Sequence, residues 1–294
     1  MPPQKTAKGL IKLSDCLTNL KQTISESARA KTLSGLRSHF YDLDNLTGGF
    51  APASLIALAG RSQVDISAFA LAIAANVAKY SDKSVAYFTT GRPKVRLTQQ
   101  LLAQESNISF SKINNSQITE QECKVLNKAI ALLPSVPLFV DDTPQITVDD
   151  IRASLLKLQS QGLQKELGLI VIDRLQLIIA SSSVNRTEEL SKIIRNLKRL
   201  AKELNVPILM LCEINQSVDV RVNKRPRLTD ISNCGSIEDV ADLVLMMYRE
   251  NYYELYNLEQ EIIEIIVAKN RNGAGDTIKL LYRPNFAQFR NLAK

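Results

Sequence analysis

The sequence predicts an α/β domain with a doubly wound, mostly parallel central sheet. Short apolar runs rich in β-branched residues alternate with helical segments over five units, and the C-terminal part reads as strands and hairpins. Apolar runs of this kind are typical of strands that are buried on both faces, and strand–helix alternation favours parallel pairing. We therefore expect a ligand site outside the carboxyl ends of the strands.

A basic segment, residues 1–33, precedes this domain. Leu10, Leu13, Leu17, Leu20 and Ile24 recur at spacings of three and four residues, which predicts a helix with one apolar stripe. A lone amphipathic helix needs a surface that buries its stripe. The sequence leaves two surfaces open, one on the chain's own domain and one on a neighbouring subunit.

The domain itself is expected to run from residue 34 to residue 294. Its predicted strands cover residues 55–60, 84–90, 137–142, 169–173 and 207–213, and its helices cover 67–80, 96–105, 148–159 and 187–204. Further strands at 243–248, 261–269, 277–282 and 287–290 are expected to be C-terminal antiparallel strands. Asn272–Gly273 and Gly275–Asp276 supply turn residues between two of them.

Composition narrows the function classes. The net charge of +7 and the pI of about 9.2 favour an anionic partner such as nucleic acid, although a merely soluble protein has the same balance. Cys16, Cys123, Cys212 and Cys234 lack CxxC spacing and His39 is the single histidine, which disfavours zinc and histidine-relay chemistry. The chain has neither a signal-peptide core nor the roughly 20 apolar residues of a membrane span, so we expect a cytoplasmic protein.

Residues 60–67 follow an apolar strand and open a helix, where a phosphate-binding loop would lie. Such a loop needs backbone amides around the phosphates, a glycine for close approach, a lysine, and a hydroxyl that holds magnesium. Here Asp65 stands at the penultimate glycine and Ile66 at the lysine, and both changes oppose binding of a polyanion. The candidate nucleotide-binding residues are Gly60, Arg61, Ser62, Gln63, Val64, Asp65, Ile66 and Ser67. Taken alone, the segment also fits an ordinary strand-to-helix turn.

A second apolar strand ends on Asp173, the usual setting for a carboxylate that holds a magnesium-bound water. Apolar strands that end in aspartate are common, but the pairing with a loop far upstream makes the signal stronger. Ser67 and Asp173 are the candidate magnesium ligands if a nucleotide binds.

Eight short stretches then resemble, in order, the motor domain of DnaB-type replicative helicases. They are FYDLD (40–44), LTGG (46–49), AFAL (68–71), PLFVDDTP (137–144), LGLIVIDRLQLI (167–178), LAKELNVP (200–207), KRP (224–226) and GSIE (235–238). The resemblance covers about residues 35–294 and implies a RecA-like fold, with ATP and magnesium as the family's cofactors. It also implies that residues 10–30 are a linker helix that docks on the adjacent protomer of a hexameric ring, and that the family's globular N-terminal domain is missing.

The resemblance also implies roles for single residues. Asp173 corresponds to the Walker B carboxylate, and Lys269 and Arg271 to the positive groups that reach a neighbour's γ-phosphate. Glu213 stands at the polar sensor position, normally glutamine, and Gly91 stands where the family has its catalytic glutamate. Without the resemblance, Lys269 and Arg271 fit a solvated strand end.

The family's DNA contacts are altered as well. An arginine and a glutamate of its central DNA-binding loop correspond to Ser232 and Asn233 here. A basic loop can track phosphates without sequence readout, and a solvated loop is the alternative. The candidate DNA-binding residues are Arg221, Lys224, Arg225, Arg227 and Gly235.

Three functions follow from these observations. The first is a non-hydrolysing pseudo-helicase or assembly subunit of DNA replication or repair, which joins DnaB-type subunits as a homo- or hetero-oligomer and contributes Lys269 and Arg271 in trans. The second is an active ATP-dependent 5′–3′ DNA helicase with an atypical loop, in which Lys94 reaches the phosphates. The third is a non-enzymatic scaffold that binds DNA or a partner. With Ile66 and Gly91 at the catalytic positions, binding of ATP and magnesium and enzymatic activity itself stay open.

Overall fold

The computed structural model describes Leu13 and residues 34–61, 64–163, 165–179, 185–231, 237–250 and 260–292. The chain divides into two units, Met1–Ser34 and Gly35–Lys294, and the elements below belong to the second. Apart from Leu13, whose side chain is exposed, the predicted N-terminal helix lies outside the described residues.

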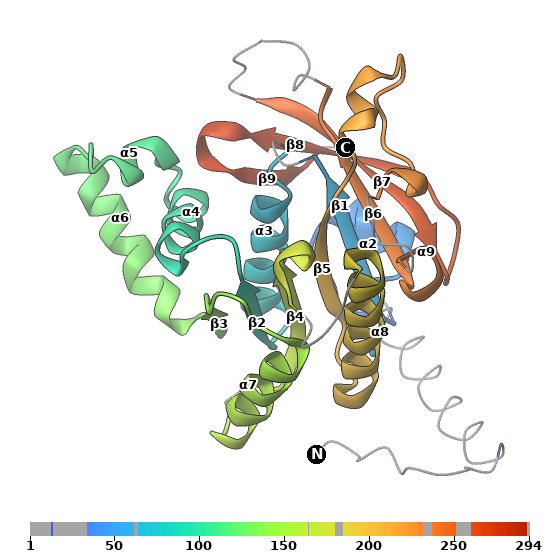
Figure 1. Cartoon of the computed structure of the whole chain (residues 1–294). Helices are drawn as coiled ribbons and strands as arrows, with labels where there is room; N and C mark the ends of the chain where they lie inside the picture. The colour runs from blue at the N-terminus through green and yellow to red at the C-terminus, as the bar shows by residue number, and fades with distance from the viewer. Residues whose placement is uncertain are drawn as a thin grey trace. The chain divides into compact units, whose positions relative to one another are not determined.

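Within the described residues, nine strands form one sheet in the order β3-β2-β4-β5-β1-β6-β7-β8-β9 (Figure 1). The parallel part contains β1 (Leu55–Gly60), β2 (Ser84–Thr89), β3 (Leu138–Asp141), β4 (Leu167–Asp173), β5 (Ile208–Glu213) and β6 (Leu243–Tyr248). The antiparallel part adds β7 (Glu261–Asn270), β8 (Thr277–Arg283) and β9 (Gln288–Asn291). The predicted fold class is thus confirmed. The expectation that residues 243–248 form an antiparallel strand was only partly right, because β6 pairs antiparallel with β7 but parallel with β1.

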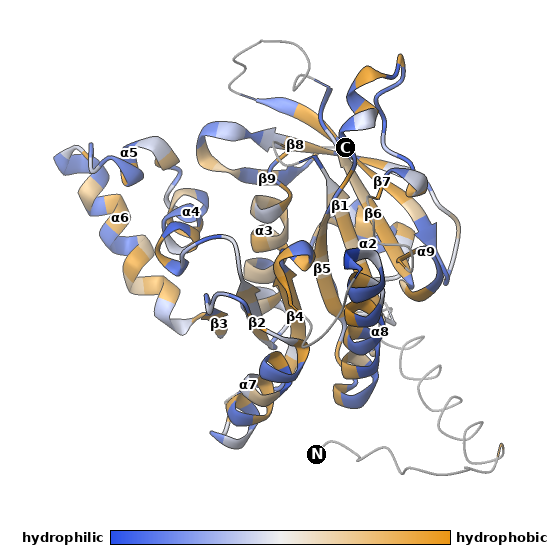
Figure 2. Cartoon of the chain, viewed as in Figure 1, coloured by the Kyte–Doolittle hydropathy of each residue, from blue (hydrophilic) through white to orange (hydrophobic). Residues whose placement is uncertain are grey.

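Helices cover both faces of this sheet. They are α2 (Tyr41–Thr47), α3 (Ile66–Tyr80), α4 (Lys94–Ser106), α5 (Phe110–Asn114), α6 (Glu120–Leu132), α7 (Val148–Ser160), α8 (Arg186–Leu204) and α9 (Ile237–Val240). Side chains of β1 alternate between two hydrophobic clusters: Ile56 and Leu58 pack on the side of α3, whereas Ala57 and Ala59 pack on the side of α7 and α8. This two-sided burial explains why the central strands are apolar throughout, as the orange ribbons of Figure 2 illustrate. No helix in the described ranges is long and apolar enough to cross a bilayer.

The sequence patterns missed α5 and α6, which lie with α4 beside α3 (Figure 1). The apolar residues Val125, Leu126, Ala129 and Ile130 of α6 recur at helical spacing, but nearly every residue of this helix is at least partly exposed, so the stripe packs on little of the core. A second signal was its start, where Thr119 and Glu122 form a reciprocal capping box.

Candidate nucleotide site

The candidate loop lies at the carboxyl edge of the parallel strands. Gly60 ends β1 beside Glu213 at the end of β5, and Asp173 ends β4 beside Thr89 of β2. Ser67, in the first turn of α3, reaches from the loop to Asp173. The fold therefore brings the predicted loop, the carboxylate and the sensor position to one edge, where doubly wound folds bind their ligands.

Both oxygens of Asp173 are hydrogen-bonded by protein hydroxyls. The Ser67 hydroxyl donates to Oδ1 at 3.1 Å, and the Tyr87 hydroxyl donates to Oδ2 at 3.0 Å. Asp173 is 3% exposed, and Tyr87 lies in the core. Burial and the nearby Asp173 charge raise the pKa of Tyr87 well above its usual value, so the phenol stays a donor.

The side chain of Ile66 is packed into the core and is 2% exposed. A Cβ atom on Gly60 would lie 2.6 Å from Ile66 Cγ2, so the glycine at the end of β1 leaves the space that this side chain fills. Val64 is buried as well. The loop thus turns two apolar side chains inward, while Ser62 and Gln63 lie outside the described residues.

Asp65 ties the loop to the antiparallel part of the sheet. Its backbone is left-handed (φ 56°, ψ 39°), a conformation that favours glycine but that aspartate tolerates. Its carboxylate accepts a hydrogen bond of 2.5 Å from the Tyr282 hydroxyl, and Arg249 lies 3.9 Å away. Burial and the Asp65 charge raise the pKa of Tyr282.

Arg61 points toward the segment that follows β5. Its guanidinium forms an ion pair of 2.9 Å with Asp219 and a hydrogen bond of 3.4 Å to the carbonyl of Ile214. The Nε atom of Arg61 is buried without a hydrogen-bond partner, so only the two terminal nitrogens of the guanidinium hold the side chain in place. These contacts hold the start of the loop against the rest of the domain.

Lys269 and Arg271 lie at the opposite end of the sheet from this loop. Arg271 forms an ion pair of 3.0 Å with Asp242. The Asp242 carboxylate also accepts a hydrogen bond from the backbone amide of Leu55, the first residue of β1. Six strand residues at about 3.3 Å each separate the two ends of β1, roughly 20 Å. The two cations therefore cannot reach the loop of their own chain.

Both cations also contact the carbonyl end of α9. Lys269 Nζ donates to the carbonyl of Glu238, and Arg271 donates to that of Asp239. Burial and the neighbouring Arg271 charge lower the pKa of Lys269. These contacts orient both side chains at the sheet edge.

Two of the four predicted DNA-binding cations are paired within the chain. Arg221 forms an ion pair of 2.6 Å with Asp230, and Arg225 binds Glu264 through two hydrogen bonds of 2.7 and 2.8 Å. The Glu264 hydrogen bond raises the pKa of Arg225, so this guanidinium stays charged. Of the remaining positions, Arg227 donates its backbone amide to Asp230, Lys224 has a contact of its own, and Gly235, Ser232 and Asn233 lie outside the described residues.

A family model described as "DnaB-like helicase C terminal domain" matches residues 35–291 of this chain. The chain belongs to this family. It is 39% identical to a probable replicative DNA helicase of Trieres chinensis and 40% identical to the replicative DNA helicase DnaB of Geobacillus stearothermophilus, with 94% and 89% of the chain aligned. These alignments span only 61% and 58% of those relatives' own length.

Solved structures resemble the whole DnaB-like domain. One ATPase domain superposes with a TM-score of 0.90 at 26% identity, covering 97% of this chain and all of that domain. A DnaB-like replicative helicase superposes with a TM-score of 0.87 at 27% identity, covering 97% of this chain and 68% of that one. The fold of the described strands and helices is therefore that of these ATPase domains.

Three further residues that the sequence analysis singled out, Glu213, Gly91 and Lys94, lie in defined surroundings in this DnaB-like domain. Arg174 forms an ion pair with Glu213, which offsets the negative charge that the sequence places beside the loop. A Cβ atom on Gly91 would lie 2.8 Å from Leu177 Cδ1, so a larger residue there would require Leu177 to move. Lys94 is exposed and pairs with Asp142 at 3.2 Å.

Sequence reasoning missed the tyrosines and Arg249 of the DnaB-like site. Tyr87 lies within an apolar strand, and its polar hydroxyl in that setting was the only signal available. Tyr282 and Arg249 are far from the loop in sequence and meet Asp65 only through the β6–β7–β8 order of the sheet. Across the described ranges, His, Cys, Asp and Glu side chains form no group of three or more with the geometry of a metal site.

Proposed function

We propose that this chain is a non-hydrolysing subunit of a DnaB-type helicase assembly that serves DNA replication or repair. It joins further DnaB-type subunits, its own copies or active ones, and offers Lys269 and Arg271 to the nucleotide site of a neighbour. Single-stranded DNA is its proposed substrate, contacted through the basic segment 221–227. The family membership supports the assembly, and the site geometry supports the loss of hydrolysis.

The observation that carries the proposal is the environment of Ile66. A lysine at this position would neutralise phosphate charge, whereas Ile66 is apolar and buried against Gly60. Asp65 adds a carboxylate to the same loop, and Tyr87 occupies one oxygen of Asp173. The residues present therefore do not fit a magnesium–triphosphate, and Arg61 and Arg174 beside the loop are already paired with Asp219 and Glu213.

The presence of Lys269 and Arg271 supports a role at the nucleotide site of a neighbouring subunit. A positive group that stabilises charge on a transferring phosphoryl needs no phosphate loop on its own subunit. Lys269 and Arg271 are present at the edge opposite the loop, where a neighbouring subunit's phosphate could meet them. The exposed apolar side chains of α6, Val125, Ile130 and Leu132, offer a surface that assembly could cover.

The active-motor alternative requires Lys94 to replace the missing ammonium. Lys94 is engaged twice by Asp142, which accepts from its backbone amide at 3.0 Å and pairs with its Nζ atom at 3.2 Å. Hydrogen bonds from Lys94 lower the pKa of Asp142, so the pair is charged at neutral pH. Gly91 also supplies no side chain to orient an attacking water. Both facts favour the non-hydrolysing subunit.

Equilibrium binding of a fluorescent ATP analogue with magnesium tests the proposal. We expect no saturable binding by the wild type and a gain of binding by an Asp65→Gly, Ile66→Lys double variant. Val95→Lys, which adds a lysine at an exposed position of α4, is the matched control and should not bind. Thermal unfolding of each variant establishes that it is folded. Tight wild-type binding accompanied by turnover would restore the active motor.

A further inference from the structure

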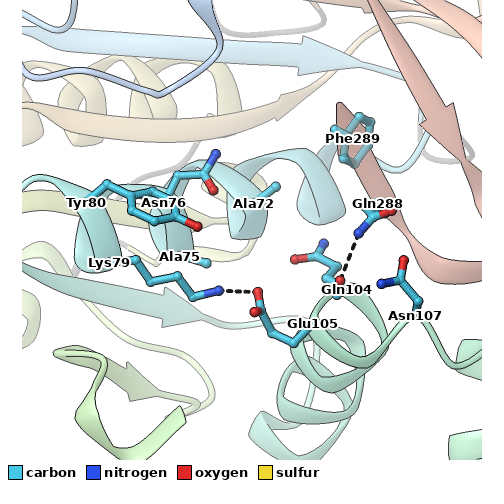
Figure 3. Close-up of a pocket in the computed structure, with 10 residues that line it drawn as sticks. All are labelled: Ala72, Ala75, Asn76, Lys79, Tyr80, Gln104, Glu105, Asn107, Gln288 and Phe289. Atoms are coloured by element: carbon cyan, nitrogen blue, oxygen red, sulfur yellow. Dashed lines mark hydrogen bonds and ion pairs between the residues drawn. The ribbon is translucent and has the colours of Figure 1, made fainter. Parts of the chain in front are cut away.

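A groove lies along the C-terminal half of α3, between α2, α4 and β9 and away from the candidate loop. It consists of two adjoining cavities of about 260 and 550 Å³, which share Asn76, Tyr80 and Phe289 in their walls. In the smaller one, the small residues Ala72 and Ala75 of α3 lie between polar walls (Figure 3). The walls of this groove contain none of the candidate nucleotide-binding residues and neither Lys269 nor Arg271.

Exposed aromatic rings border this groove. Tyr41 and Tyr80 both line the larger cavity and are each 67% exposed. The His39 ring lies 5.3 Å from the Tyr80 ring, so Tyr80 is oriented from one side and open on the other. Nucleic-acid bases stack on aromatic side chains in such a position, at about 1–3 kcal/mol for each base.

Two arginines meet at the end of α4 beside these rings. Arg283 and Arg290 both donate to Asn107 Oδ1, at 2.9 and 3.3 Å. Within the described part of the chain, neither forms an ion pair with a carboxylate; Glu105, on the same wall, is paired with Lys79. The carbonyl end of α4 offsets only about half a unit charge. Arg290 lines the larger cavity, whereas Arg283 lies beside the groove, donates also to Gln288 Oε1 at 3.0 Å and lies over the Phe286 ring. The two guanidinium groups therefore leave net positive charge and further N–H donors beside the groove.

Two amide side chains of the groove have hydrogen-bonding capacity left for a ligand. Asn76 donates to the carbonyl of Ser38, but its own Oδ1 has no partner among the described residues, and neither has Nδ2 of Asn107. The groove thus presents one acceptor and one donor beside the aromatic rings. Base edges carry both donors and acceptors, so these two amides can bind the edge of a base whose face stacks on a tyrosine ring. The rings, the amides and the arginines together match the bases and phosphates of a nucleic acid, because an acidic peptide offers no aromatic bases to the two tyrosines.

We propose that this groove binds single-stranded DNA, with bases on Tyr80 and Tyr41 and phosphates on Arg283 and Arg290. The site is separate from the basic segment 221–227 and does not depend on the proposed non-hydrolysing role. Binding here would hold a strand along α3 outside any contact made by that segment.

The chain contains no tryptophan, so Tyr80→Trp places a single reporter in the groove. Titration of this variant with oligothymidylate of about 12 nucleotides should quench its fluorescence with saturation, because stacked bases contact the indole. Leu156→Trp, at an exposed position on α7, is the matched control and should keep its fluorescence.

Adding Arg283→Ala and Arg290→Ala to the reporter variant should weaken this quenching. The slope of log affinity against log salt should fall in magnitude by about 0.7 for each phosphate contact removed. Arg152→Ala, which removes a surface cation paired with Glu203, should leave both quantities unchanged. Unchanged Tyr80→Trp fluorescence while a labelled oligonucleotide binds the chain would overturn the proposal, as would quenching by a polyglutamate peptide but not by DNA.

Discussion

At the scale of single residues, the candidate loop differs from a phosphate-binding loop by where its side chains lie. Ile66 belongs to the hydrophobic core, and Asp173 is a buried carboxylate with two hydroxyl donors. Burying an isolated carboxylate is costly, and each hydrogen bond to it offsets part of that cost. The loop residues therefore contribute to folding in ways that substitutions can measure.

Ile66→Val should destabilise the domain by about 0.5–1.5 kcal/mol and Ile66→Ala by about 2–5 kcal/mol, as expected for deletions in a packed core. Urea unfolding monitored by circular dichroism measures both. Val95→Ala, at a position that is 63% exposed, is the control and should change stability by less than about 0.5 kcal/mol. A negligible effect of Ile66→Ala would mean that the side chain projects into an open loop.

Tyr87→Phe should destabilise the domain by about 1–3 kcal/mol, because Asp173 loses a donor while remaining buried. The same unfolding experiment applies. Tyr41→Phe, which changes an exposed ring, is the matched control. If the two variants were equally stable, the hydrogen bond from Tyr87 to Asp173 would have no energetic role.

At the scale of elements, Asp242 joins three parts of the fold at one sheet edge. It accepts from the amide of Leu55 at the start of β1, pairs with Lys198 of α8 at 2.5 Å, and pairs with Arg271 after β7. Burial opposes the charged form, but the hydrogen bonds from Lys198 and Leu55 outweigh it and lower the pKa of Asp242. The Asp242 carboxylate thus connects Arg271 to the central strand β1 of the sheet.

Asp242→Asn should therefore destabilise the domain in a pH-dependent way, by about 1–3 kcal/mol at pH 7. A carboxyl whose pKa is lowered on folding stabilises above its unfolded value, near 3.9, and loses this contribution as pH falls through the folded value. Unfolding at pH 7 and near pH 3 should show the difference from wild type shrinking at the lower pH. Asp82→Asn, at an exposed ion pair with Lys165, should have little effect at either pH. A pH-independent loss would exclude the ion pairs as its origin.

The predicted strands and helices can be compared with the observed ones at the same scale. Sequence patterns located every strand of the described sheet within a residue or two. The central strands are buried on both faces and therefore apolar throughout, whereas β7 and β8 show buried and exposed residues in alternation. The sequence patterns missed α6, although its apolar residues recur at helical spacing and its start carries a capping box. Local patterns also could not connect Tyr282 with Asp65 across 217 positions of the chain. Such contacts depend on strand order, which local patterns do not encode.

At the scale of the whole molecule, the candidate loop lies at one end of the sheet and Lys269 and Arg271 lie at the other, so the proposed action of these cations on a nucleotide needs a second subunit. We expect the wild-type chain to change the ATPase rate of an active DnaB-type helicase on mixing, because it can present Arg271 to that enzyme's nucleotide. Arg271→Ala should still assemble but should lose this effect on rate, whereas Arg152→Ala should retain it. The measurements are steady-state hydrolysis and the mass of the mixed assembly. An unchanged rate and unchanged mass with the wild type would refute assembly in trans.

The sequence by itself determined the α/β class, the parallel core with its antiparallel addition and the DnaB-like resemblance, and it predicted Ile66 and Gly91 at positions where that resemblance implies a lysine and a glutamate. These follow from local patterns, since hydrophobic period and motif order are written along the chain. Only the tertiary structure decided that Ile66 packs on Gly60, that Asp65 meets Tyr282, that Tyr87 binds Asp173, and that Lys269 and Arg271 lie a strand length from the loop. These facts depend on which distant segments the sheet brings together, and the free energy of that packing belongs to the whole domain rather than to any one segment.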